Sequence, residues 1–326
     1  MYNSKKILLA SLLATSLYGT DNQILLENSW SNISYSTAKD SMLSGATTAT
    51  GKGYSALFTN PAGLATNYST GLYTRAVDID HKNANGSTDD DNSLTTTKQI
   101  TTSDTMAIGV FYKSFVVESQ KDIHNALGMA YGYESKYGLF SVGANYVIDT
   151  TTVDNYLDAG TGDYYTIGFQ WQKSFIDIDD FYGLYFGFSK KGQGVNIIDG
   201  EQIGVVSPIV QKIGFGFETN VFSSTMLVTL DMTDQSWSHI GDTLSTQAIG
   251  LKWMMFSGFS IGLGASTSSY STELNLKDST TLSAGVEFVI WKMNVAVAAV
   301  QKDVNNKSGD VYMQENSLHA DISFAF

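Results

Sequence analysis

The segment SLHADISFAF, residues 317–326, decides the fold. In an extended chain one of its faces is apolar: Leu318, Ala320, Ile322, Phe324 and Phe326. The opposite face is polar or small: His319, Asp321, Ser323 and Ala325. A period of two is typical of a β-strand that turns one face toward an apolar environment.

The same alternation recurs along most of the chain, for example at residues 225–233, 247–255, 258–266 and 280–290. The second face of these segments carries Gly, Ser and isolated charges rather than the many Lys and Glu of a soluble sandwich. An apolar face opposite a small, polar face is typical of a barrel with lipid outside and a lumen inside. We therefore expect an all-β, antiparallel transmembrane β-barrel.

Strand-length segments alternate with connections that are short, as at 221–223, or long, as at 149–163 and 191–207. Bacterial outer-membrane barrels combine short turns at one end with longer loops at the other and have an even strand number. The strand count lies between twelve and fourteen. The alternation of short and long connections, together with the need for an even number, favours fourteen. The expected strands are 68–78, 94–101, 105–116, 125–134, 138–148, 164–175, 181–190, 208–220, 224–233, 245–255, 257–268, 280–290, 292–301 and 317–326.

Composition excludes several classes of protein. Nineteen basic residues face 32 acidic ones, and Arg75 is the only arginine, so the chain lacks the basic surface of a nucleic-acid binder. The absence of Cys excludes disulfides, thiolate zinc sites and cysteine nucleophiles. A mean hydropathy of −0.07 argues against a helical membrane bundle.

Both ends of the sequence carry export features. Residues 1–19 combine Lys5 and Lys6 with the apolar run 7–17, which predicts a secretory signal peptide; a buried N-terminal helix is the alternative. Phe326 resembles the terminal aromatic residue that bacterial outer-membrane barrels present to their assembly machinery. We expect the outer membrane of a Gram-negative bacterium as the location, with its lipid bilayer and the barrel assembly machinery as partners.

Residues 20–67 precede the first expected strand and lack sustained alternation. A fourteen-stranded barrel, residues 68–326, has a bore too wide for side chains alone to fill. We therefore expect residues 20–67 to fold back as a plug, with a disordered periplasmic leader as the alternative.

Within this segment, SGATTATGKGYSALFTNPAGLA (44–65) resembles the N-terminal hatch signature of the FadL/TodX outer-membrane transporters. The matching residues are Asn60, Pro61, Ala62, Gly63 and Leu64. Asn60 suits the cap of a short helix, and Pro61 suits its first position.

The resemblance implies a hatch inside a fourteen-stranded barrel that admits small hydrophobic or amphipathic solutes, such as fatty acids or aromatic hydrocarbons, by passive diffusion. The same signature also resembles PorV-like secretion accessories and TraF-like proteins of conjugation clusters. A non-transporting barrel that docks partners for secretion or conjugation is therefore the alternative function.

The alternation places a set of charged and histidine side chains in the lumen, where they would pair, hold the plug or line a path: Lys113, Glu134, Lys212, Glu218, Asp231, Lys252, Glu287, His319 and Asp321. In segment 280–290, Val286 faces lipid and Glu287 the lumen. We therefore expect Val286→Lys to impair assembly and Glu287→Lys to be tolerated far better.

No catalytic set is recognisable, so we expect neither an enzyme nor a cofactor. Two acidic groups could bind Ca²⁺: Asp89, Asp90 and Asp91 in a predicted outer loop, and Asp177, Asp179 and Asp180 in a short turn. Neither has the spacing of an EF-hand loop, and we expect no metal site.

Overall fold

A computed structural model describes residues 37–66, 71–83, 88–103, 106–117, 120–153, 156–176, 181–192, 194–198, 201–207, 209–237, 242–270, 276–306 and 311–325. The signal peptide, the first part of the expected plug and Phe326 lie outside these ranges and stay predictions.

Residues 37–66, which we call the hatch segment, form four short helical elements. These are α3 (Ala38–Ser41), η2 (Gly53–Ser55), α4 (Ala56–Thr59) and η3 (Pro61–Thr66). Thr37 begins α3 with a capping box, because its hydroxyl accepts from the Asp40 N–H while the Asp40 carboxylate accepts from the Thr37 N–H. No helix in the described part of the chain has the length and apolar character to cross a membrane.

The rest of the described chain consists of strands. The first eight are β1 (Gly71–Asn83), β2 (Thr88–Ser103), β3 (Met106–Val117), β4 (Gln120–Ser135), β5 (Gly138–Val153), β6 (Tyr156–Ile176), β7 (Phe181–Lys191) and β8 (Gly194–Ile198). The second eight are β9 (Glu201–Ser207), β10 (Ile209–Val221), β11 (Ser224–Trp237), β12 (Asp242–Phe256), β13 (Phe259–Tyr270), β14 (Leu276–Ile290), β15 (Met293–Asn306) and β16 (Val311–Ala325).

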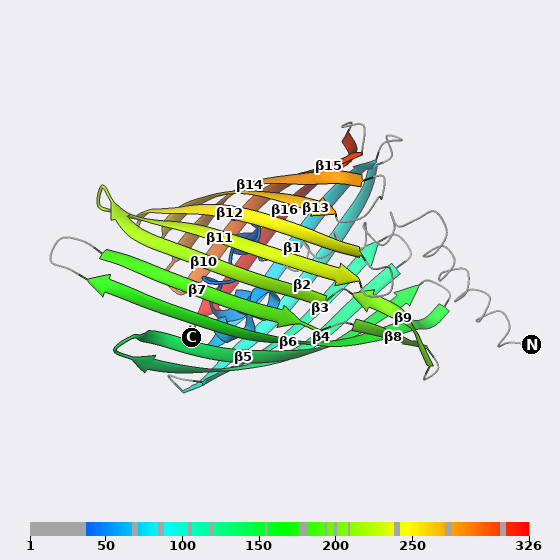
Figure 1. Cartoon of the computed structure of the whole chain (residues 1–326), viewed down its shortest axis with the longest axis horizontal. Helices are drawn as coiled ribbons and strands as arrows, with labels where there is room; N and C mark the ends of the chain where they lie inside the picture. The colour runs from blue at the N-terminus through cyan, green and yellow to red at the C-terminus, as the bar shows by residue number, and fades with distance from the viewer. Residues whose placement is uncertain are drawn as a thin grey trace, which may run out of the picture.

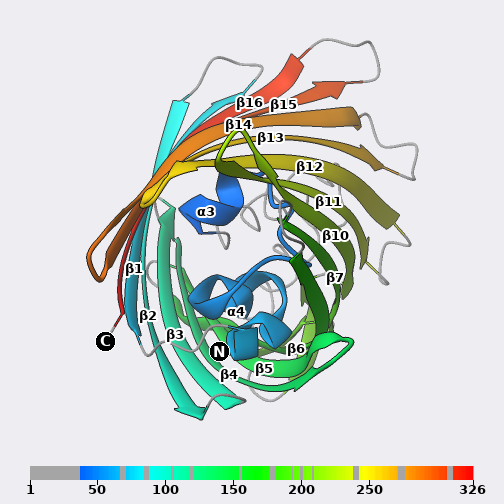
Figure 2. The same cartoon turned by 90° about the vertical axis from the view of Figure 1, so that its left-hand side faces the viewer.

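Antiparallel pairings join fourteen of these strands into a ring, confirming the predicted barrel. The ring runs from β1 through β5 to β6 and β7, passes to β10, continues to β16 and returns to β1. The small hairpin β8–β9 lies outside the ring and pairs with β6. Figure 1 shows the long oblique strands, and Figure 2 shows α3 and α4 inside the ring.

The strands are longer than predicted at the end of the barrel opposite the short turns. Residues 149–153 and 156–163, expected in a loop, continue the β5–β6 ladder, and 191–207 contains the β8–β9 hairpin. Asp89, Asp90 and Asp91 lie in β2 rather than in an outer loop. These loop predictions were wrong because backbone pairing needs no apolar face, so it continues where the alternation has ended.

The described side chains alternate between the two faces of the wall. Glu287 on β14 is buried, whereas its neighbour Phe288 is exposed, and His319 and Asp321 on β16 are buried beside exposed Leu318 and Ile322. The outward face is rich in exposed large apolar side chains: Leu127, Met129, Ile167, Phe215, Leu230, Met232, Ile249, Leu263, Leu282 and Leu318.

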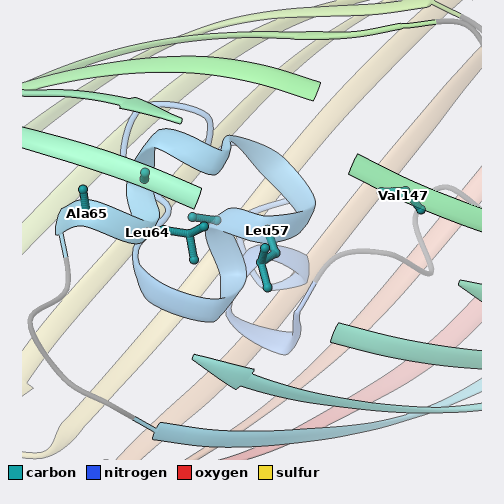
Figure 3. Packing of buried hydrophobic residues seen from close by; sticks show 6 residues of the cluster. Leu57, Leu64, Ala65 and Val147 are labelled. Atoms are coloured by element: carbon teal, nitrogen blue, oxygen red, sulfur yellow. The ribbon is translucent and has the colours of Figure 1, made fainter. Parts of the chain in front are cut away.

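The described hydrophobic core lies between the hatch segment and the inner wall. Leu57, Leu64 and Ala65 pack with Ala130 of β4 and Val147 of β5 (Figure 3). A second cluster joins Ala38, Met42 and Leu43 to Ala296 and Ala298 of β15. The hatch segment is thus packed against two separate parts of the ring.

Candidate functional site: the hatch segment and the lumen wall

The turn between α4 and η3 packs on a pair of glycines. Asn60 ends α4 in an extended conformation, and its Oδ1 accepts from the Ala62 N–H at 3.2 Å, at the start of η3. Gly143 and Gly168 lie opposite each other on β5 and β6. A Cβ at Gly168 would collide with the Asn60 side chain, and one at Gly143 with the Pro61 backbone. The wall is therefore bare of side chains where the predicted motif residues lie.

Facing pairs of glycines recur at other points of the lumen wall. Gly187 of β7 lies opposite Gly214 of β10, and a Cβ at either position would meet the backbone of Thr48 or Ala49. Four of the wall positions that contact the end of α3 and the turn after it are also glycines, arranged in two facing pairs: Gly250 with Gly264, and Gly262 with Gly285. Paired glycines allow the hatch backbone to approach the wall closely.

Neutral polar side chains of the wall bind the hatch backbone. Asn145 Nδ2 donates to the Leu57 carbonyl at 2.8 Å, and Ser189 Oγ donates to the Thr59 carbonyl at 3.0 Å. Gln170 Nε2 donates to the carbonyls of Thr48 and Gly51 at 3.0 and 3.1 Å. These three residues were not among the predicted lumen residues, which were charged side chains and one histidine. Their position on the polar face of alternating strands could have identified them.

Two predicted lumen residues of β16 contact α3. Asp321 Oδ2 accepts from the Ala38 N–H at 2.5 Å, and His319 Nδ1 lies 3.1 Å from Ser41 Oγ. Ser317 Oγ lies 2.9 Å from the other ring nitrogen of His319. The carboxylate thus accepts from a free N–H in the first turn of α3, where anions are favoured.

Glu287 of β14 lies between two ammonium groups. Its Oε1 is 2.6 Å from Lys39 Nζ of α3, and its Oε2 pairs with Lys252 Nζ of β12. Asn294 Nδ2 of β15 also donates to Oε1, at 2.6 Å. Burying a carboxylate removes it from water at a cost in free energy. Charge-assisted hydrogen bonds from several partners offset this desolvation cost.

The remaining predicted residues have less uniform positions. Asp231 is buried and accepts from the Thr48 N–H at 2.9 Å; Lys212 lies on the same face of β10 as Gly214. Glu218 accepts from the Tyr185 hydroxyl at 2.5 Å. Glu134 is exposed at the end of β4, and the side chain of Lys113 is outside the described set.

The hatch segment contains its own buried acid. Burial raises the pKa of the Asp40 carboxyl, and the hydrogen bonds from Thr37 act against this shift. Across the described residues, no group of three His, Cys, Asp or Glu side chains is placed to hold a metal ion. The contacts at this site are hydrogen bonds, ion pairs and packing, which can hold a barrier in place and release it reversibly.

No family model matches the chain, and no curated protein matches it. Solved structures resemble its fold. A Pseudomonas aeruginosa FadL homologue is similar over 89% of this chain and 98% of its own, at 11% identity and a TM-score of 0.54. The P. putida toluene transporter TodX is similar over 89% and 98%, at 11% identity and 0.51. The monoaromatic hydrocarbon channel CymD is similar over 89% and 97%, at 11% identity and 0.51.

Proposed function

We propose that this protein is an outer-membrane channel that admits small hydrophobic or amphipathic solutes by passive diffusion, without catalysing a reaction. The observation that carries the proposal is a hatch segment bound inside a fourteen-stranded ring by contacts that can break and re-form. The fold shared with hydrocarbon channels and a FadL homologue supports it. Fatty acids and aromatic hydrocarbons are the solute classes that we propose.

The outer wall supports a membrane location. Large apolar side chains such as Phe215, Leu230 and Leu263 are half exposed on one face of successive strands. In water, so much contiguous apolar surface would drive association. In a bilayer the same surface contacts lipid, while the charged lumen face is shielded by the wall.

The test is uptake. Liposomes that contain the refolded protein should accumulate radiolabelled toluene or oleate faster than empty liposomes, with saturation at high solute concentration. Control liposomes should contain an eight-stranded barrel that has no channel. Equal rates in both preparations would contradict the transport proposal.

A docking function is the second candidate, and one observation favours it. Two turns at the same end of the barrel carry aromatic side chains that are almost fully exposed: Phe222 at 96% and Trp291 at 94%. Both residues have positive φ angles, of 49° and 60°, which are unfavourable for bulky side chains. Exposed aromatic residues are also frequent anchors of protein interfaces.

One pair of variants separates the two functions. If the protein docks partners, Phe222→Ser and Trp291→Ser should abolish secretion or conjugation by cells that carry these variants and leave solute uptake at its basal level. If it transports, the same changes should leave saturable uptake intact, because neither side chain lies in the lumen.

A further inference from the structure

A depression lies on the outer surface of the wall, over three neighbouring strands. It is a shallow, open hollow with a volume of about 490 Å³. The lining residues form a three-by-three block on β14, β15 and β16: Leu282, Ser283, Ala284, Ala299, Val300, Gln301, Asn316, Ser317 and Leu318. Figure 2 shows these strands side by side.

The depression opens on the outer side of the wall rather than into the lumen. Its outward members, including Leu282, Ala284 and Leu318, are exposed, whereas the members between them, Ser283, Val300 and Ser317, are buried. Ala284 and Ala299 pair directly across β14 and β15, so their small side chains form the floor. Leu282 and Leu318 stand at opposite corners of this floor.

The depression is amphipathic along the strand direction. Ala284, Ala299 and Leu318 form the cross-strand row nearer the short turns. The next outward row, two residues further along each strand, carries Leu282 on β14 and the amides Gln301 and Asn316, which pair directly across β15 and β16. Over β15 and β16 the apolar part therefore lies toward the short turns and the polar part toward the end with the longer hairpins, while Leu282 continues the apolar part over β14.

An acid lies just beyond the amides. Gln301 Nε2 donates to Asp303 Oδ2 at 3.2 Å, and Gln314 Nε2 donates to Asp303 Oδ1 at 2.8 Å. These side chains mark the point where the outward face of β15 and β16 becomes polar. A carboxylate at this position would repel an anionic headgroup, whereas the amides can bond an uncharged one.

We propose that this depression binds a single hydrocarbon chain of a membrane lipid that carries an uncharged hydroxyl, ester or amide head. The chain lies over Ala284 and Ala299 between the two leucines, and its head bonds Gln301 and Asn316. The site rests on the membrane location of the proposed function. In a bilayer, the favourable free energy of binding relative to bulk lipid comes from close packing and from these hydrogen bonds, because water is already excluded.

The wall under this site also holds the hatch segment. Ser283 Oγ, between Leu282 and Ala284, accepts from the Ser44 N–H at 3.0 Å on the lumen side. Ser317, next to Leu318, contacts His319, which contacts Ser41. A lipid chain at the outer site and the hatch at the inner one thus lie on opposite faces of the same strands.

The experiment uses photolabelling of the full-length mature protein in phosphatidylcholine nanodiscs. One probe is a hexadecanol with a diazirine in its chain, and the other is the matching hexadecanoic acid at pH 8. Labelled peptides are mapped by mass spectrometry. We expect the alcohol to label peptides containing residues 282–284 and 299–301 several-fold more than the outward residues of β5, and the acid to show no such excess.

Ala299→Phe should fill the floor and reduce this excess to the level of the rest of the wall. Ala144→Phe is the matched control, because Ala144 is an exposed, outward alanine on β5, across the barrel; it should leave the excess unchanged. Ala299→Leu is a smaller change for the case in which the Phe variant does not fold.

Three outcomes would overturn the proposal. Uniform alcohol labelling of the wall would show that there is no site, yet would leave the membrane location intact. Equal enrichment by the acid would rule out selection for an uncharged head. Loss of the excess in saturating toluene would identify the site as one for the transported solute. A fourth outcome would instead contradict the proposed function itself: no position on the wall is labelled more strongly than a water-soluble protein is.

Discussion

Glu287 shows how a single lumen residue holds the hatch segment. It joins Lys39 of α3 to Lys252 of β12, so its charge links the hatch to the wall. We predicted from the sequence that Glu287→Lys would be tolerated far better than Val286→Lys, because Glu287 faces the lumen and Val286 faces lipid. The structure changes this expectation, since a third ammonium group would then face Lys39 and Lys252.

Glu287→Gln should therefore loosen α3. The expected cost in stability is about 1.5–3 kcal/mol, the typical contribution of a hydrogen bond to a charged group, because two ammonium groups lose their charged partner. The measurement is ion conductance in planar bilayers, which should rise above that of the unaltered protein. Asp303→Asn, an acid on the outer face, is the control and should leave conductance unchanged.

Val286→Lys tests the outward face at the adjacent position. Val286 belongs to the outward set of β14, so a lysine there would meet lipid at a cost of roughly 2–4 kcal/mol near mid-bilayer. We expect a lower folded yield, measured by the heat-dependent shift of the barrel on gels. A yield equal to that of the unaltered protein would mean that this face does not contact lipid.

At the scale of elements, the facing glycines determine how closely the hatch lies against the strands. Gly187→Ala would place a methyl group against the backbone of Thr48 and Ala49, neither of which is a flexible side chain. Overpacking of this kind typically costs about 1–3 kcal/mol. We expect faster proteolysis of the hatch segment in the folded barrel, measured in detergent micelles. Ala144→Val, which enlarges an outward residue of β5, should leave the proteolysis rate unchanged.

For the strands of the ring, alternation predicted the middle of the strand but not the end opposite the short turns. The β14 core at 280–290 was found from its apolar face, whereas residues 276–279 of the same strand carry Lys277, Asp278 and Ser279 and no such face. Lipid contact imposes the alternation only within the bilayer, and the ladder beyond it is held by backbone bonds. For the same reason the irregular hatch could be delimited by its lack of pattern, but its partners Asn145 and Gln170 could not be identified.

The whole molecule is a ring with a separate segment inside it, and removing that segment tests its role. Deleting residues 22–58 should leave a barrel that inserts into membranes but conducts ions, because a fourteen-stranded bore is too wide for its side chains to close. Conductance of single insertions in planar bilayers is the measurement. If the deletion variant folds and is as silent as the intact protein, the hatch segment is not the barrier. We also expect the deletion variant to lose saturable uptake of solute.

The bond from the Ala38 N–H to Asp321 joins residues 283 positions apart. The N-terminal part of the hatch therefore has no partner on β16 until almost the entire chain has been synthesised. Loop-closure entropy opposes contacts between such distant residues, and chains dominated by them fold slowly. If the protein is exported to the outer membrane, as proposed, the unpaired hatch segment and strands must be kept from aggregating on the way. The time spent in this unpaired state, rather than the stability of the finished barrel, should then limit how much protein reaches the membrane.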